Sequence, residues 1–289
     1  MKKIRIGGVP EHYNYPWHLA LNNKTFSNNN IDLIWTNYST GTGAMCKDLE
    51  ADILDMAIIL TEGAVNALSN NNTFSLVKIF VDSPLNWGIH VPATSELKNI
   101  DEIKGQTYAI SRFGSGSHLM AYVDAKIRGW ETTKLQFQIV NNMDGAVDSF
   151  RKKESSVFFW EKFTSQPMVD AGEFKLLDIR PTPWPCFVLV ARKDFLKQNL
   201  SLTKTVCEIV NQHVHNLSLN QDQSIKNIAN MYGLSNTAVE QWFQLTTWNT
   251  NWQIKTSDLS LIGNTLADLK LINNIPNPET IISPITQLT

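Results

Sequence analysis

Cysteine and basic clusters are both scarce in this sequence, and each scarcity excludes a class of protein. The three cysteines, Cys46, Cys186 and Cys207, are widely spaced, match no zinc-ligand spacing and leave an odd count for disulfide pairing. We therefore expect free thiols in a reducing compartment. The nearest approach to a basic cluster is residues 151–153, and the formal net charge is −2, so neither nucleic acid nor an anionic membrane surface is an expected partner.

Long hydrophobic runs are also absent. The segment MKKIRIGGVP has only a few apolar residues before Gly7 and Gly8, where a secretion signal needs about 7–15. No window approaches the roughly 18 apolar residues of a membrane span. These absences predict a cytoplasmic protein without membrane insertion, and a periplasmic or extracellular location would require a signal removed from the start.

The patterning that is present predicts an α/β architecture with two lobes. At 289 residues with 43% hydrophobic content, the chain can bury a large core. Short apolar runs alternate with segments of helical period, which predicts mostly parallel sheets flanked by helices. In the first half we expect strands at 3–8, 31–36 and 53–60, and helices at 15–29, 41–51 and 61–71.

A second series of strands and helices begins after an extended stretch at 87–91. Its expected strands are 106–111, 135–141, 155–160 and 174–179, before a proline-stiffened segment and a helical C-terminal part. We therefore expect lobe one to contain both chain ends, residues 1–90 and 188–289, and lobe two to be the inserted residues 91–187. Two strand-like hinge crossings would join the lobes around a ligand cleft.

Six loops follow the carboxyl ends of the expected strands, where ligands bind in open parallel sheets. The sequences STGTGAM and FGSGSHLM, in two of these loops, share hydroxyl residues and glycines at a helix start. Free backbone N–H groups and the helix dipole there favour a carboxylate, sulfonate or phosphate. Ordinary helix capping is the alternative explanation of each loop.

The loop residues predict ligand binding and no catalysis. The stretch SRFGSGS lacks the Lys-Ser/Thr ending of a P-loop and the spacing of G-x-S-x-G. Loop carboxylates more often cap helices or hold a ligand's N–H groups than transfer protons, and no metal or cofactor spacing is present. Core packing is an alternative role for Trp160. The candidate ligand-binding residues are Glu11, His12, Thr40, Gly41, Thr42, Thr61, Glu62, Arg112, Gly114, Ser115, Gly116, Ser117, Asn142 and Trp160.

Four segments carry a family resemblance that spans nearly the whole chain. They are GTGAMCKDLEADILDMAIILTEG, YAISRFGSGSHLM, WEKFT and IANMYGLSNTAVEQW. With them the sequence resembles proteins of the type II periplasmic-binding-protein fold, in the group of nitrate, sulfonate and taurine substrate-binding proteins and the thiamine-pyrimidine proteins called NMT1/THI5-like. The resemblance implies an α/β fold of two lobes, each with a mostly parallel sheet flanked by helices.

The resemblance also implies a function. It implies non-catalytic binding of a small polar or anionic molecule, such as a sulfonate or a pyrimidine, in the interlobe cleft. A cytosolic enzyme of thiamine-pyrimidine precursor metabolism on the same fold is the alternative, although the cysteine-rich C-C-C-F-C segment of the fungal pyrimidine synthases is absent. We expect a monomer; the resemblance allows an ABC permease as a partner, and the sequence does not indicate one.

Overall fold

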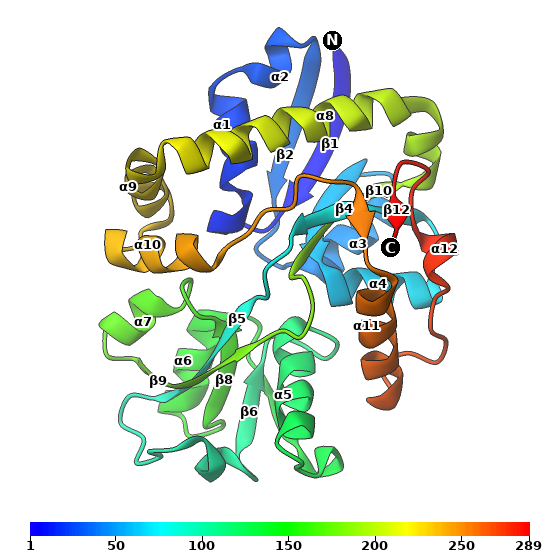
Figure 1. The fold of residues 1–289 in the computed structure, drawn as a ribbon. Coiled ribbons are helices and arrows are strands. Elements are labelled where there is room, and N and C mark those ends of the chain that lie inside the picture. Colours follow the sequence, from blue (N-terminus) through cyan, green and yellow to red (C-terminus); the bar gives the residue numbers. More distant parts are fainter. The chain divides into compact units, whose positions relative to one another are not determined.

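A computed structural model describes all 289 residues, and the chain divides into two compact units (Figure 1). Unit 1 comprises Met1–Ser83 and Trp184–Thr289, and unit 2 comprises Pro84–Pro183. These boundaries precede the expected ones at 90/91 and 187/188. The first difference arises because β5 (Asn86–Pro92) pairs along its whole length with β9 (Phe174–Pro181), so the entire strand belongs to the sheet of unit 2.

Unit 1 contains a five-stranded sheet in the order β2-β1-β3-β10-β4. Only β10 runs antiparallel to its neighbours. The step from β1 to β2 moves along the sheet in the opposite direction to the step from β2 to β3, so right-handed crossovers place their helices on opposite faces. The strands are β1 (Lys2–Gly8), β2 (Ile31–Asn37), β3 (Met56–Leu60), β4 (Phe74–Val81) and β10 (Phe187–Arg192).

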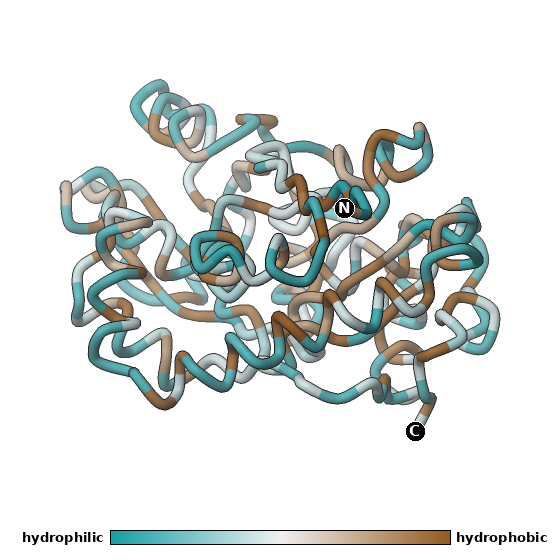
Figure 2. The backbone as a smooth tube through the Cα atoms, turned by 90° about the horizontal axis from the view of Figure 1, so that it is seen from above, coloured by the Kyte–Doolittle hydropathy of each residue, from teal (hydrophilic) through white to brown (hydrophobic).

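The helices of unit 1 are amphipathic elements that cover this sheet. In Figure 1 the long α8 (Lys193–Leu219) crosses in front of β1 and β2, and its residues Val206, Val210, Val214 and Leu217 are buried. Figure 2 shows brown and teal alternating along the coiled parts of the tube, as expected for helices that bury one side. The remaining elements are η1 (His12–Asn14), α1 (Tyr15–Asn22), α2 (Thr25–Asn28), α3 (Thr42–Glu50), α4 (Thr61–Asn70), α9 (Gln221–Tyr232), α10 (Asn236–Leu245), α11 (Thr256–Asp268), α12 (Pro278–Ile281), β11 (Gln253–Ile254) and β12 (Gln287–Leu288).

Strand β4 has no counterpart among the expected strands. All of its residues are buried, including Lys78. The Lys78 ammonium donates to Asn211 Oδ1 at 2.9 Å, and burial lowers the pKa of Lys78 to about 8. A partnered lysine therefore lies inside a core strand, and its charge interrupts the apolar run that would otherwise reveal the strand.

Unit 2 contains a second five-stranded sheet, in the order β7-β6-β8-β5-β9. β6, β7 and β8 are parallel, and β5 is antiparallel to both of its neighbours. Both sheets are mostly parallel and flanked by helices, which confirms the α/β class predicted from the sequence. The other elements of unit 2 are η2 (Ile100–Ile103), β6 (Thr107–Ile110), α5 (Gly116–Ile127), η3 (Thr132–Lys134), β7 (Gln136–Ile139), α6 (Met143–Arg151), β8 (Val157–Glu161) and α7 (Gln166–Asp170).

Candidate functional site

The parallel strands β2, β1 and β3 of unit 1 end at the same edge of their sheet, where the predicted residues of this unit lie. Glu11 directly precedes η1, in the connection that follows β1. Thr40, Gly41 and Thr42 follow β2, and Thr61 opens α4 immediately after β3. The strand order thus brings together three of the loops singled out in the sequence.

The starts of α3 and α4 are joined to one another at this edge. Leu60 N donates to Thr42 Oγ1 at 3.1 Å, so the hydroxyl of α3's first residue holds the end of β3. A Cβ atom on Gly63 would lie 2.5 Å from Thr42 Cγ2, so the two helix starts can pack this closely only with glycine there. Gly41, with φ 75°, precedes α3, and Leu60 precedes α4. Neither helix has a side-chain cap hydrogen bond.

Thr61 and Glu62 are buried polar residues in the first turn of α4. Trp184 Nε1 donates to Glu62 Oε2 at 2.9 Å, whereas Glu62 Oε1 and Thr61 Oγ1 have no hydrogen-bond partner. Burial raises the pKa of Glu62 to about 7. Two unsatisfied polar atoms therefore lie beside the uncapped helix start, and one belongs to a carboxyl that changes protonation near neutral pH.

His12 is placed in the aromatic core of unit 1. Its ring stacks on Tyr13 with centroids 4.8 Å apart and meets Trp242 edge-on at 4.4 Å. Burial lowers the pKa of His12 to about 3, so the imidazole is neutral at pH 7. It cannot serve as a cationic contact for an anionic ligand at that pH.

In unit 2 the glycine-serine turn uses its own hydroxyls. Ser115 Oγ accepts from His118 N at 3.3 Å and lies 3.0 Å from Ser117 Oγ. Ser117 Oγ also accepts from Ser111 N at 3.0 Å, and Gly114 N donates to His118 Nδ1 at 3.1 Å. These bonds use acceptor sites of both serine oxygens and one of their two O–H donors, so the turn is held largely by its own residues. A contact of these serines with a ligand stays a prediction.

The other predicted residues of unit 2 are more varied. Asn142 caps α6, accepting from Gly145 N at 2.9 Å. Trp160 stacks on Phe158 with ring centroids 5.2 Å apart and packs against the core of this unit. Arg112 and Gly116 are partly exposed, and Gly114 is exposed. Capping and packing, the alternatives left open by the sequence, thus account for the contacts of Asn142 and Trp160.

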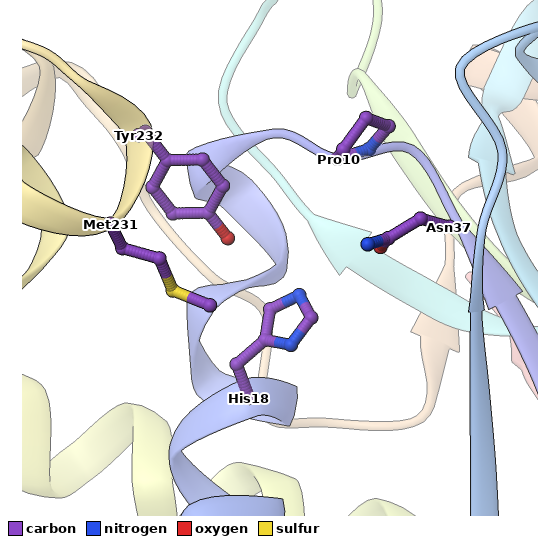
Figure 3. A pocket seen from close by; sticks show the side chains of 5 residues that line it. All are labelled: Pro10, His18, Asn37, Met231 and Tyr232. Carbon is purple, nitrogen blue, oxygen red and sulfur yellow. The ribbon is translucent and has the colours of Figure 1, made fainter.

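A pocket of about 320 Å³ in unit 1 is lined by residues outside the predicted set (Figure 3). Pro10 and Asn37 border it from the carboxyl ends of β1 and β2, and His18 from α1; Met231 and Tyr232 border it from α9. Sequence reasoning missed Met231 and Tyr232 because no pattern links the end of α9 to residues some two hundred positions earlier. The nearest signal was the position of Pro10 directly before the candidate residues Glu11 and His12.

Two further features bear on the chemistry that the chain can perform. No group of three or more His, Cys, Asp or Glu side chains is arranged to hold a metal ion. None of the helices combines the length and the apolar character that crossing a membrane requires.

Known structures resemble the whole chain. The Candida albicans CA3427 gene product, described as defining a family with the generic periplasmic binding protein fold, superposes with a TM-score of 0.87 at 23% identity, covering 100% of this chain and 99% of that one. The chain has the periplasmic-binding-protein fold. This finding confirms the fold predicted from the sequence motifs. A family model described as Ca3427-like PBP matches residues 87–179, which lie within unit 2.

Sulfonate-binding proteins share this fold with the chain. The aliphatic sulphonate binding protein SsuA of Escherichia coli matches with a TM-score of 0.76 at 16% identity, covering 98% of this chain and 97% of that one. The alkanesulfonate-binding protein SsuA of Xanthomonas axonopodis, bound to MOPS, matches with a TM-score of 0.80 at 15% identity, covering 100% and 99%. No curated protein matches the sequence.

Proposed function

We propose that this protein binds a small anionic molecule without converting it, and that the starts of α3 and α4 in unit 1 hold the anionic group. The observation that carries the proposal is the junction of these helices, where neither has a side-chain cap and Thr42 Oγ1 is committed to Leu60 N. The first N–H groups of a helix have no partner within the helix and lie at the positive end of its dipole. At α4 the first of them, Thr61 N, donates to Cys186 O at 3.0 Å, so the anion would be held by the N–H groups that follow it. Such a pair of helix starts suits an anion.

Sulfonates and phosphonates are the ligand classes that we favour. A tetrahedral oxyanion has three oxygens to accept from N–H groups that converge from two helices. Structures of the same fold support the choice, since three are described as sulfonate-binding and one, from Prochlorococcus marinus, as a complex with methylphosphonate. Below about pH 7 a protonated Glu62 would add a donor beside the anion.

The expectation that loops of unit 2 add contacts to the same ligand stays a prediction. So do the cytoplasmic location and the monomeric state. A sulfonate or phosphonate is also the kind of cargo for which an ABC permease would be the partner, and this too is an expectation only.

Isothermal titration calorimetry with methanesulfonate, methylphosphonate and sulfate tests the proposal directly. Leu60→Asp introduces a carboxylate cap at the start of α4, where the backbone is already extended with φ −60° and ψ 136°. The carboxylate would accept from the N–H groups of α4 and repel the anion. We therefore expect about 100-fold weaker binding, which corresponds to the loss of roughly two charge-assisted hydrogen bonds. The neutral cap in Leu60→Asn should weaken binding by about 10-fold.

Leu219→Asp is the matched control, because it places the same charge on an exposed leucine at the end of α8. It should bind like the unmodified protein. If no anion binds, or if Leu60→Asp binds as tightly as the control, the helix starts are not the site. Mass spectrometry of the recovered ligand tests the non-catalytic part, since any conversion would favour the enzyme alternative.

A further inference from the structure

The pocket lined by Pro10, His18, Asn37, Met231 and Tyr232 has a chemistry opposite to that of the helix starts. None of its five side chains carries a positive charge at pH 7, because burial lowers the pKa of His18 and keeps its imidazole neutral. An anion entering this pocket would lose its hydration without gaining a cationic partner. We therefore expect the pocket to bind a ligand that differs from the anion proposed for the helix starts.

The hydroxyl of Tyr232 is the main polar group aimed into the pocket. Figure 3 shows it pointing into the space between Pro10, Asn37 and His18. The hydroxyl oxygen is buried and has no hydrogen-bond partner. Burial and the negative charge of Glu11 both raise the pKa of Tyr232, so the group stays protonated and able to donate, and the nearby carboxylate disfavours anions.

Asn37 and His18 add directional groups around this hydroxyl. The Asn37 carbonyl accepts from Trp35 Nε1 at 2.8 Å, which fixes the side chain and leaves its NH₂ group as a donor. His18 meets Trp35 edge-on with ring centroids 5.0 Å apart, and its neutral ring offers one donor and one acceptor. The polar lining can thus pair with a ligand that has both N–H groups and ring nitrogens.

The rest of the lining and the size of the pocket set the shape of the ligand. The Tyr232 and His18 rings, the Met231 thioether and Pro10 present surfaces that pack well against a flat ring. A volume of about 320 Å³ is at the low end of small-molecule sites, which span about 300–1,000 Å³. The pocket is therefore sized for a compound of one or two rings.

We propose that this pocket binds a small planar nitrogen heterocycle that carries no negative charge, and that it does so independently of the anion site at α3 and α4. The binding groups are the Tyr232 hydroxyl, the Asn37 amide and the neutral His18 ring, with Met231 covering the ring face.

Calorimetric titration with nicotinamide and nicotinate tests the charge requirement, because the two share a ring and differ in charge; cytosine and adenine extend the neutral set. We expect the neutral compounds to bind and nicotinate to bind at least about 10-fold more weakly than nicotinamide. Equal affinity for nicotinate and nicotinamide would overturn the proposal. So would the failure of all three neutral compounds to bind.

Three variants test the location. Tyr232→Phe removes only the hydroxyl and should weaken nicotinamide binding by about 5-fold, the effect of one hydrogen bond. Tyr108→Phe is the matched control, because the Tyr108 hydroxyl of unit 2 is also buried without a partner, and it should change nothing. Met231→Trp starts from an exposed side chain and should fill the pocket and abolish binding.

Binding that survives both Met231→Trp and Tyr232→Phe would place the heterocycle elsewhere and overturn the assignment. Leu60→Asp should leave nicotinamide affinity unchanged. Failure of this proposal and failure of the anion proposal are therefore separate results.

Discussion

The helix starts at the strand ends of the two units satisfy their backbone groups in different ways. In unit 2, Ser115 caps α5 and Asn142 caps α6 with side-chain hydrogen bonds. In unit 1, α3 and α4 have no side-chain cap, and the hydroxyl of Thr42 bonds across to Leu60 N. Similar glycine and hydroxyl sequences thus build a helix start with a side-chain cap in one unit and helix starts without one in the other.

This difference shows that a hydroxyl residue beside a glycine has two uses at a helix start. If its oxygen accepts from its own helix, the turn is stabilised and fewer donors remain for a ligand. If it accepts from a neighbouring element, the helix keeps its free N–H groups. From this comparison we expect the turns of unit 2 to serve mainly stability, and those of unit 1 to hold the anion of the proposed function.

The largest expected effect on stability comes from adding one methyl group at the third residue of a helix in each unit. A Cβ atom on Gly145 of α6 would lie 1.9 Å from the Val140 carbonyl oxygen, whereas on Gly63 of α4 its closest contact would be the side-chain methyl of Thr42, at 2.5 Å. Because a backbone atom cannot turn aside, Gly145→Ala should lower the free energy of unfolding by about 3 kcal/mol or more. Gly63→Ala should lower it by about 1–2 kcal/mol.

Urea unfolding measures both values, and calorimetry with methanesulfonate supplies the second readout. Gly63→Ala should weaken anion binding because it moves the two helix starts apart. Gly145→Ala should leave the affinity unchanged in the folded protein. The opposite ranking of affinities would assign the anion site to unit 2.

Each unit also contains one buried carboxyl whose protonation should make stability depend on pH. Burial raises the pKa of Glu62 in unit 1 and of Glu161 in unit 2 from 4.5 to about 7. Between these values the folded chain keeps a proton that the unfolded chain has lost, so stability is highest below 4.5 and falls as the pH rises to about 7. Each group should cost up to about 3 kcal/mol over this range.

Denaturant titrations across this pH range, with Glu62→Gln and Glu161→Gln, check the sign and the share of each group. Each variant should reduce the fall in the free energy of unfolding between pH 4.5 and about 7 by about half. The anion should change the pH dependence of the free energy of unfolding more in Glu161→Gln than in Glu62→Gln. Glu161→Gln keeps Glu62, which is the carboxyl beside the proposed anion site. A decline that neither variant alters would mean that neither carboxyl has a raised pKa in the folded state.

The smallest expected effects come from removing single hydroxyls. Ser115→Ala removes a cap and should lower the free energy of unfolding by about 1 kcal/mol. Thr61→Val keeps the shape of a side chain whose hydroxyl is buried without a partner, so it should be neutral or stabilising by up to about 1 kcal/mol. Thermal unfolding without ligand compares the two, and equal losses would show that the Thr61 hydroxyl has a stabilising role.

Most of the fold could be predicted because its signals are local. The strands ending near Gly8, Asn37 and Leu60 and the helices that follow them have periodicities that a short window reveals. β4 could not be predicted, because Lys78 interrupts the apolar run and its hydrogen-bond partner Asn211 lies far along the chain. The boundary near residue 90 also shifted, since pairing with β9 decides which sheet β5 joins.

The candidate site was predictable in outline and not in detail. Strand order predicts that loops at the carboxyl ends of parallel strands gather at one edge, and the structure brings the starts of α3 and α4, with Thr42 and Glu62, together there. The hydrogen-bond partner of each hydroxyl could not be predicted, because Thr42 Oγ1 accepts from Leu60 N of a neighbouring strand and Ser115 Oγ accepts from His118 N of its own helix. His12 was predicted as a ligand contact, and the structure packs it against Trp242 instead.

The sequence by itself determined the alternation of strands and helices, the positions of the glycine turns and the absence of any metal-ligand spacing. These properties depend on neighbouring residues and on composition. The tertiary structure alone decided which hydroxyls form hydrogen bonds within the protein and which carboxyls are buried. It also decided that Tyr232 and Pro10 line the same pocket. Hydrogen-bond partners and burial depend on residues that are distant in the chain and adjacent only after folding.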